Sequence, residues 1–324
     1  MSRKIFNTSL LLLLMGFNAA NAQNKPNTVK TLKLTILSTM LTDFNGMGEW
    51  GFCALVEVDG KKILFDTGAR PETVLNNIRE LKIDLTDVTE VFISHNHQDH
   101  TGGLNSLKKV LSETNPKALS VAHIGEGAFY PRPRAMGDTT ASYMITARKE
   151  FEKAGGKFIV YRETKEIYPG VWITGPVPRV HPERNWMGQG KMILPDGKVA
   201  EDVIPEDQSM IFNTADGLII LSGCGHAGVV NTMEYARKQI GVQTVSTLLG
   251  GFHLFNLSDE KIKWTATKMK EYGVQNFIGA HCTGVNAAFD IRQQLGLSRS
   301  NAVVGAVGSS FELGKGIAPG MIAK

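Results

Sequence analysis

The chain has 324 residues, a length that allows one large domain or two small ones. With 42% hydrophobic and 20% charged residues it can bury a sizeable core, which excludes a disordered chain. The formal charge is +4, and it falls to +2 if Arg3 and Lys4 are removed with an N-terminal segment. So small a charge excludes the basic surface typical of nucleic-acid-binding proteins, and we expect no nucleic-acid partner.

Residues 1–22 have the pattern of a secretory signal peptide. Two basic residues precede the apolar run Leu10–Met15, and Ala20-Asn21-Ala22 follows as a cleavage pattern of small residues. The apolar run is well below the ~20 residues needed to span a bilayer, so an uncleaved membrane anchor is the weaker alternative. We therefore expect cleavage before Gln23, no membrane attachment of the mature protein, and a periplasmic or secreted location.

From Gln23 onward, runs typical of strands and of helices alternate, and no linker or internal repeat divides them, so we expect one domain over residues 23–324. Pro71 is expected in the first turn of a helix whose buried face starts at Val74. In chain order the first two thirds predict strands at Leu32–Leu37, Cys53–Val58, Lys62–Phe65 (after a turn at Asp59-Gly60), Val88–Ser94, Ala118–Ala122, Lys157–Tyr161, Val171–Thr174, Met210–Asn213 and Leu218–Leu221.

The last third alternates more regularly. It predicts a helix at Val229–Ile240, a strand at Val245–Leu249, a helix at Asp259–Tyr272 capped by Ser258, a strand at Asn276–Gly279, a helix at Val285–Leu295 and a strand at Ala302–Val307. Two mostly buried sheets with helices outside, an α+β arrangement, fit this order better than a doubly wound sheet, because the opening is rich in hairpins. Residues 124–208 are rich in Pro, Gly and Arg, and we expect an irregular segment that covers a site.

The residues with the clearest chemistry lie where the predicted strand Val88–Ser94 ends. His95, His97, Asp99 and His100 bring three imidazoles and a carboxylate within six residues, just before a Gly-Gly pair. Protonated imidazoles so close together would repel one another, whereas a divalent cation such as zinc binds neutral imidazole and carboxylate together. This spacing predicts a metal site rather than a solvated histidine-rich loop.

This motif resembles the His-x-His-x-Asp-His motif of the metallo-β-lactamase superfamily. Leu64–Gly68 is similar to that family's early Asp-x-Gly segment, in which Asp66 would orient the metal-binding loop. The resemblance extends from about Leu32 to Leu313. Four further motifs resemble a subgroup named for 7,8-dihydropterin-6-ylmethyl-4-(β-D-ribofuranosyl)aminobenzene 5′-phosphate synthase; they are Pro205–Ser209, Ser222–Gly228, Gly250–Leu254 and His281–Gly284.

The resemblance implies a four-layer αββα sandwich that binds two divalent metal ions, zinc before manganese or iron. His95 and His97 would hold the first ion, Asp99 and His100 the second, and His281 would complete the second site. The hydrolases of the superfamily usually carry Gly-Asp, with a carboxylate that bridges both ions, where this chain reads Gly223-Cys224. That departure leaves the remaining ligands open.

Four histidines remain to supply the third ligand of the first ion. His226 is favoured over a core role, because it stands two residues after Cys224 at a strand end and an extended backbone aims both side chains to one side. Cys224 is either a thiolate ligand or a small buried thiol. His253 follows Gly-Gly and is expected to face substrate rather than metal. His123 and His181 are expected to be hydrogen-bonded within the fold.

The cysteines and arginines give weaker signals. Cys53, Cys224 and Cys282 are too few for a disulfide framework, and a Cys224–Cys282 disulfide is disfavoured.

The segment 124–208 contains cationic and aromatic side chains that would suit an aromatic substrate with a phosphate or carboxylate group. The alternative is that they form a solvated loop face. These residues are Tyr130, Arg132, Arg134, Arg179, Arg184 and Trp186.

Together these features predict an exported metal-dependent hydrolase that uses a metal-activated hydroxide on an ester-like bond, with Asp99 as proton acceptor. Two dications make the site positive, so we expect a small anionic substrate, a phosphodiester or lactone rather than a β-lactam. The alternatives are a pterin-related phosphoribosyl-type transferase, a non-catalytic metal-binding or ligand-binding protein, and redox chemistry at a single iron.

Overall fold

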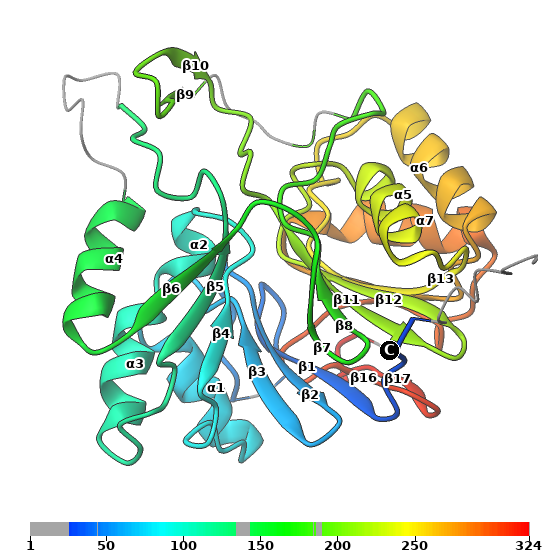
Figure 1. Ribbon diagram of the computed structural model, residues 1–324. Helices are drawn as coiled ribbons and strands as arrows, with labels where there is room; N and C mark the ends of the chain where they lie inside the picture. The colour runs from blue at the N-terminus through cyan, green and yellow to red at the C-terminus, as the bar shows by residue number, and fades with distance from the viewer. Residues whose placement is uncertain (1–25, 44, 134–142, 184, 186–189, 324) are drawn as a thin grey trace, which may run out of the picture.

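The computed structural model describes residues 26–43, 45–133, 143–183, 185 and 190–323. Within them, two β-sheets lie face to face and helices cover the outer face of each sheet (Figure 1). The chain therefore has the predicted four-layer αββα architecture. Residues 1–22, predicted as a signal peptide, lie outside the described residues. In the part of the chain that the structure describes, no helix is long and apolar enough to cross a membrane.

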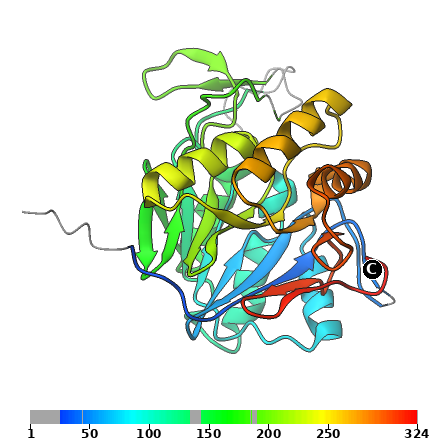
Figure 2. The same cartoon turned by 90° about the vertical axis from the view of Figure 1, so that its right-hand side faces the viewer.

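The first sheet has eight strands, which in spatial order are β17 (Gly316–Ala318), β16 (Ser310–Glu312), β1 (Leu32–Ser38), β2 (Cys53–Val58), β3 (Lys61–Phe65), β4 (Glu90–Phe92), β5 (Val121–Gly125) and β6 (Lys157–Tyr161). β1, β2 and β3 pair antiparallel, as the Asp59-Gly60 turn predicts, whereas β3 to β6 pair in parallel. Figure 2 shows the C-terminal hairpin of β16 and β17 beside β1, so both ends of the described chain belong to this sheet.

The second sheet has seven strands, which in spatial order are β15 (Ala302–Val304), β14 (Asn276–Gly279), β13 (Val245–Gly250), β12 (Gly217–Ser222), β11 (Ser209–Thr214), β8 (Val171–Ile173) and β7 (Lys165–Tyr168). β12 to β15 pair in parallel, so their carboxyl ends share one edge. A separate hairpin of β9 (Lys191–Ile193) and β10 (Val199–Glu201) stands above the sandwich in Figure 1.

Helices bury both outer faces of the sandwich. The first sheet is covered by α1 (Thr73–Leu81), α3 (Leu104–Ser112) and α4 (Tyr143–Lys153), and the second by α5 (Val229–Ile240), α6 (Asp259–Glu271) and α7 (Val285–Leu295). One apolar cluster, which includes Phe92 and Phe212, fills the space between the sheets, and two more lie beneath the two helical layers. Because each sheet is covered on both faces, its central strands are continuous apolar runs rather than alternating ones.

Most predicted strands and helices are present, with ends shifted by a few residues. The strand predicted at Ala118–Ala122 begins three residues later, as β5, and the one predicted at Val88–Ser94 is reduced to β4. Pro71 precedes α1 instead of opening it, and Ser258 stands at the start of α6 without a side-chain hydrogen bond to cap it. These differences concern element ends, where apolar patterning carries the least information.

The segment 124–208, predicted to be irregular, contains more regular structure than the sequence indicates. Besides strands, it holds α4 and the β9–β10 hairpin. Helix α4 escapes a periodicity analysis because most of its residues are polar or charged and it buries few side chains, namely Met144, Ala147 and Phe151. The stretch 134–142, in the middle of this segment, lies outside the described residues.

Candidate metal centre

Five strand ends position the candidate site. β3 and β4 end side by side in the first sheet, and β12, β13 and β14 end side by side in the second. The loops that follow these strands carry Asp66, His95, Cys224, His253 and His281 in turn. Because the carboxyl ends of parallel strands meet at one edge of a sheet, loops far apart in sequence converge at one place.

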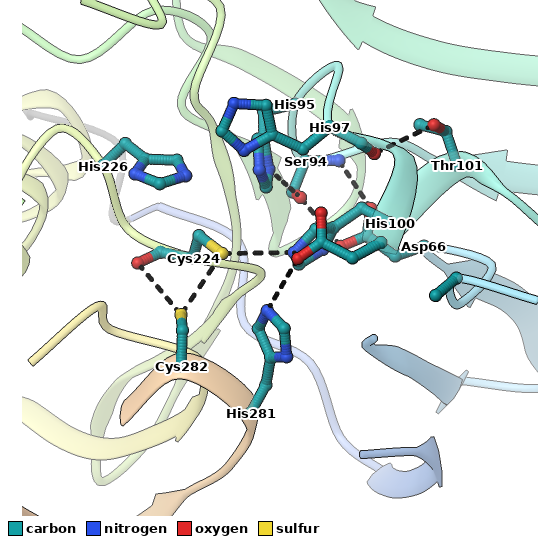
Figure 3. A network of polar contacts seen from close by, with 12 residues as sticks. Asp66, Ser94, His95, His97, His100, Thr101, Cys224, His226, His281 and Cys282 are labelled. Atoms are coloured by element: carbon teal, nitrogen blue, oxygen red, sulfur yellow. Dashed lines mark hydrogen bonds and ion pairs between the residues drawn. The ribbon is translucent and has the colours of Figure 1, made fainter. Parts of the chain in front are cut away.

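The side chains with ligand chemistry form one cluster (Figure 3). His97 directly precedes α2 (Gln98–Thr101), which carries Asp99 and His100. Donor atoms gather in four overlapping sets, and within each set all the atoms lie within 4.8 Å of one another. The sets are Asp99, His100, Cys224 and His281; His95, Cys224 and His226; Cys224, His253 and Cys282; and His95, His97 and Asp99. Every residue predicted as a ligand belongs to at least one set.

Asp66 orients the histidine-rich loop without belonging to a donor set. Its Oδ1 accepts the backbone N–H of Ser94, and its Oδ2 accepts the Ser94 hydroxyl, both at 2.7 Å. The same Oδ2 lies 2.7 Å from His100 Nδ1, while the Ser94 oxygen lies 2.9 Å from His95 Nδ1. Since each partner accepts, both Nδ1 atoms carry the proton and both Nε2 atoms keep a lone pair directed away from Asp66.

Buried ring nitrogens without hydrogen bonds point into the cluster. The Asn185 carbonyl oxygen lies 2.6 Å from His226 Nδ1, which leaves the lone pair on Nε2. Nε2 of His95 and His226, and both ring nitrogens of His253 and His281, are buried and make no hydrogen bond. Burial lowers the pKa of His95 and His226 well below the ordinary value, so these rings are neutral. Neutral, unpaired imidazole nitrogens fit a divalent metal ion.

Asp99 belongs to two of the donor sets. Its Oδ2 is 3.3 Å from His281 Nε2 and 3.7 Å from His100 Nε2. Burial acts to raise the pKa of Asp99, but His100 and His281 outweigh it and lower the pKa below its usual range. Burial also lowers the pKa of His97 to about 4. Burial acts to lower the pKa of His281, but Cys282 and Asp99 outweigh it and raise the pKa to about 10, so this ring holds a proton that a metal ion would displace. An ionised carboxylate beside imidazoles is a donor combination that zinc and similar ions accept.

Cys224 occupies the middle of the cluster, and its Sγ lies 3.1 Å from His100 Nε2. The residue before it must be glycine, because a Cβ on Gly223 would lie 2.1 Å from Ser94 Oγ and 2.7 Å from Asp66 Oδ2. Burial raises the pKa of the Cys224 thiol, so a thiolate here needs a cation beside it. Membership in three donor sets places the sulfur where a ligand shared between ions would lie, which favours the ligand interpretation over simple packing.

Three consecutive residues outside the donor sets connect the two halves of the cluster. Glu206 Oε1 accepts the backbone N–H of Asn96, between two of the ligand histidines, at 3.3 Å. Asp207 Oδ2 accepts the N–H of Ala227 at 2.9 Å, and Gln208 Nε2 donates to a carbonyl oxygen after β4 at 2.9 Å. All three side chains are buried. This segment is part of the Pro205–Ser209 motif. It fixes the position of the loop after β4 in the first sheet relative to the loop after β12 in the second.

Two histidines lie away from the cluster. His123, on β5 beside the edge strand β6 of the first sheet, contacts Tyr161 and Glu90, each at 2.9 Å. His181 Nε2 lies 2.6 Å from Glu234 Oε2 on α5. Both rings therefore have partners within the fold.

The described arginines of segment 124–208 are engaged by the protein itself. Arg132 binds Asp202 at 2.6 Å and Glu206 at 2.9 Å, and Arg179 donates to backbone carbonyl oxygens, that of His226 among them. These contacts differ from both expectations, because these two arginines neither lie on a solvated loop face nor are available to bind a phosphate or carboxylate. Of the predicted group, Arg134, Arg184 and Trp186 lie outside the described residues, and the backbone carbonyl oxygen of Tyr130 accepts a hydrogen bond from Arg132 at 3.2 Å.

A cavity of about 660 Å³ opens over the cluster. Its wall includes two aromatic side chains, Trp50 and Phe255, which are 49% and 41% exposed. Their ring centres are 5.7 Å apart, and the Trp50 ring lies 5.1 Å from that of His281. The sequence analysis does not single out either residue, because an aromatic residue in a loop forms no recognisable pattern. The cavity therefore combines a polar floor with an apolar wall, as ligand sites commonly do.

Comparison with known proteins identifies the family. The model of the metallo-beta-lactamase superfamily matches residues 51–237. The chain belongs to this superfamily. Among curated proteins, a 7,8-dihydropterin-6-methyl-4-(beta-D-ribofuranosyl)-aminobenzene-5′-phosphate synthase of Methanocaldococcus jannaschii is 30% identical over 268 residues, which cover 80% of this chain and 90% of the relative. The resemblance predicted from the motifs is thus confirmed, for the superfamily and for the subgroup.

Solved structures of the metallo-beta-lactamase fold agree. Tm1679, described as a metal-dependent hydrolase of the beta-lactamase superfamily, is 25% identical, with a TM-score of 0.66 over 86% of this chain and 98% of its own. YhfI from Bacillus subtilis is 13% identical, with a TM-score of 0.51 over 87% of this chain and all of its own, and shows the fold alone. These neighbours confirm the predicted fold class.

Proposed function

We propose that this protein is a metal-dependent hydrolase that cleaves an ester-like bond. The observation that carries the proposal is the cluster of buried, unpaired imidazole nitrogens around Asp99 and Cys224, on the floor of an open cavity. Structural histidines are normally hydrogen-bonded, as His123 is, whereas these donors are oriented by outer partners and left unpaired toward a common centre.

Two bound divalent ions, zinc before manganese or iron, would supply a hydroxide near neutral pH and polarise the bond to be cleaved. The donor sets suggest which residues hold them. His95, His97 and His226 would hold the first ion, and Asp99, His100 and His281 the second, with Cys224 between them.

The chain itself contributes proton transfer, orientation and exclusion of water. Asp99 is ionised because its pKa is lowered, so it can accept the proton of the attacking water as well as serve as a ligand. Asp66 keeps the His100 ring fixed during turnover. Trp50 and Phe255 shield one side of the cavity from water and would contact an apolar part of the substrate.

The substrate we propose is a small phosphodiester or lactone rather than a β-lactam. Two divalent metal ions bound by one carboxylate and neutral imidazoles would give the centre a positive net charge. That charge favours an anionic or strongly polarised group on the substrate. The curated relative carries a phosphate in its name. Arg132 and Arg179 do not support the preference, because buried partners already engage both, so the attraction for an anion rests on the metal ions.

The experiment combines elemental analysis of protein purified without added metal with assays on phosphodiester, lactone and β-lactam substrates. We expect bound divalent metal, turnover of a phosphodiester or lactone, and loss of that turnover in His97→Ala. Ligand-dependent stabilisation without turnover of any substrate would instead identify a binding protein. Efficient β-lactam hydrolysis with no phosphodiester or lactone activity would contradict the substrate assignment.

A second candidate is a pterin-related transferase or synthase, which the 30% identical relative favours. In this reaction the amine nitrogen of an aminobenzene ribofuranosyl phosphate compound would displace a leaving group, such as diphosphate, from the 6-methyl carbon of a dihydropterin. Incubation with these two compounds therefore separates the synthase from the hydrolase. A condensed product detected by mass spectrometry would favour the synthase.

We also propose that the protein is exported and works in the periplasm or outside the cell. The basis is the pattern of residues 1–22 alone. Mass spectrometry of the protein from separated cell fractions tests this, with the expected mature chain beginning at Gln23. A full-length chain in the cytoplasmic fraction would contradict it.

A further inference from the structure

The donor set formed by Cys224, His253 and Cys282 has no part in the mechanism above. Its Sγ and ring nitrogen atoms lie within 4.8 Å of one another, and all three residues are buried and line the floor of the cavity. Neither the motif His95–His100 nor His281 contributes to it. The set joins the two-ion cluster only through Cys224.

The two cysteines of this set face each other without a covalent bond. Their Sγ atoms are 3.2 Å apart, and both cysteines are free. Figure 3 shows the two side chains pointing toward each other. Two buried thiols in such contact gain little from packing, and two thiolates would repel each other. A cation between them would allow both to ionise and bind.

His253 supplies the third donor and has nothing else to bind in the described structure. It is only 8% exposed, and neither ring nitrogen makes a hydrogen bond. Its φ of 49° lies in the left-handed region, which residues with a side chain adopt uncommonly. A buried imidazole held in this conformation with both nitrogens unsatisfied is expected to have a partner that protein atoms do not provide.

The local backbone is shaped to bring these donors together. A Cβ on Gly251 would lie 2.0 Å from the Gly223 carbonyl oxygen and 3.0 Å from Cys282 Sγ. Only glycine therefore allows the loop after β13 to approach the Cys224 loop and the His281–Thr283 turn closely enough to form the set.

We propose that Cys224, His253 and Cys282 form a further metal-ion position with two sulfur ligands and one nitrogen ligand. It lies beside the positions formed by the histidines and Asp99 and shares the Cys224 sulfur with them. Two thiolates and an imidazole are soft donors that suit zinc, and the cavity leaves a fourth coordination position open. The inference concerns metal binding and does not depend on the hydrolase proposal.

The test uses zinc alone as the probe. The chain is reduced, loaded with zinc and freed of excess, and zinc per chain is measured by elemental analysis and Zn–S coordination by X-ray absorption. We expect Cys282→Ser to lose about one zinc per chain and half of the Zn–S contacts, and His253→Ala to lose the same zinc. Cys53→Ala, a buried cysteine in the helix-covered core of the first sheet, should match wild type.

Circular dichroism of each variant separates loss of zinc from loss of fold, and His253→Ala keeps both sulfurs if Cys282→Ser misfolds. Wild-type zinc content and Zn–S coordination in folded Cys282→Ser would overturn the proposal. So would unchanged zinc content in His253→Ala. A wild-type protein that binds the sulfur-coordinated zinc yet hydrolyses nothing would contradict the hydrolase and leave this inference standing.

Discussion

Asp66 shows how one carboxylate orients a metal centre that it does not enter. It fixes the Ser94 hydroxyl and the His100 ring, and through Ser94 the His95 ring. Two ligand lone pairs therefore depend on an acceptor behind them, which is the usual arrangement around protein-bound zinc.

Asp66→Asn should weaken metal binding by about 10–100-fold while the fold persists. The amide NH2 of asparagine would face the Ser94 hydroxyl and the His100 N–H, both donors, so the His100 ring would lose its fixed orientation. Competition with a metal indicator dye measures the affinity. Asp196→Asn, an exposed carboxylate on the surface, is the control and should bind metal as wild type does. Equal affinity in both variants would show that the orientation of His100 does not depend on Asp66.

At this scale the sequence indicates the candidate donors and Asp66, and it does not indicate the other residues that orient the donors. His95, His97, Asp99 and His100 share one short motif, so their chemistry is visible before the fold is known. Asn185 orients His226 through a backbone carbonyl, a contact that any residue type could make. Trp50 and Phe255 have no characteristic spacing either, because they meet only through the fold.

At the scale of elements, the geometry of the candidate site depends on short loops rather than on helices and strands. The segment Glu206–Gln208 just before β11 contacts the histidine-rich loop after β4 and the loop that follows β12. Two of its side chains contact the loop of the first sheet, and the third contacts the loop of the second sheet. A substitution in this segment should therefore change the distance between these two loops, which carry the candidate ligands.

Asp207→Ala should destabilise the protein by about 1–3 kcal/mol, because it leaves the Ala227 N–H buried without an acceptor. Metal affinity should fall as well, since Ala227 directly follows His226. Urea unfolding of the metal-free protein and metal competition of the loaded protein measure the two effects. Asp207→Asn retains an acceptor oxygen and should recover most of both losses. No recovery by asparagine would mean that the charge, rather than the hydrogen bond, is what matters.

Glu183 at the start of α5 should make stability fall as the pH rises from about 4.5 to about 7. Burial raises its pKa to about 7, although Oε1 and Oε2 accept the N–H groups of Val230 and Asn231 at 3.1 and 2.8 Å. The folded state then holds the proton more tightly than the unfolded chain, and each pKa unit corresponds to about 1.4 kcal/mol. Urea unfolding across this pH range should show a smaller decline in Glu183→Gln.

Glu234→Gln, on the helix α5 whose first turn Glu183 contacts, provides the control with opposite sign. His181 lowers the pKa of Glu234, so its contribution is present above the ordinary pKa and is lost in acid. Identical pH dependence in wild type and Glu183→Gln would show that the pKa of Glu183 is the same in the folded and unfolded states.

At the scale of the molecule, the candidate metal centre takes its donors from both sheets. The loop of the first sheet supplies His95 to His100, and the second sheet supplies Cys224, His226 and His281. The four-layer order follows from hydrophobic patterning, and the sequence predicts it correctly. Patterning predicts less well where burial is weak: α4 and the short pair β9 and β10 bury few side chains, so little in their sequence distinguishes them from loops.

Removing the metal should therefore lower the stability of the whole molecule. A ligand that binds only the folded state at 100 times its Kd stabilises it by about 2.7 kcal/mol. We expect a lower Tm in a chelator such as EDTA than in zinc, in one cooperative transition measured by calorimetry. The difference should shrink in His97→Ala, which loses one ligand. The same Tm with and without metal would indicate that the cluster binds no ion tightly enough to connect the two sheets.

The division of the ligands between the two sheets also orders events in time. A chain emerging from the ribosome carries His95 to His100 long before Cys224 and His281 have been synthesised. Any ion met at that stage finds half a coordination sphere and dissociates readily, because the early motif alone leaves several positions to water. Lasting capture of the ion has to wait until the second sheet packs on the first, so metal loading belongs to the last stage of the maturation of this protein.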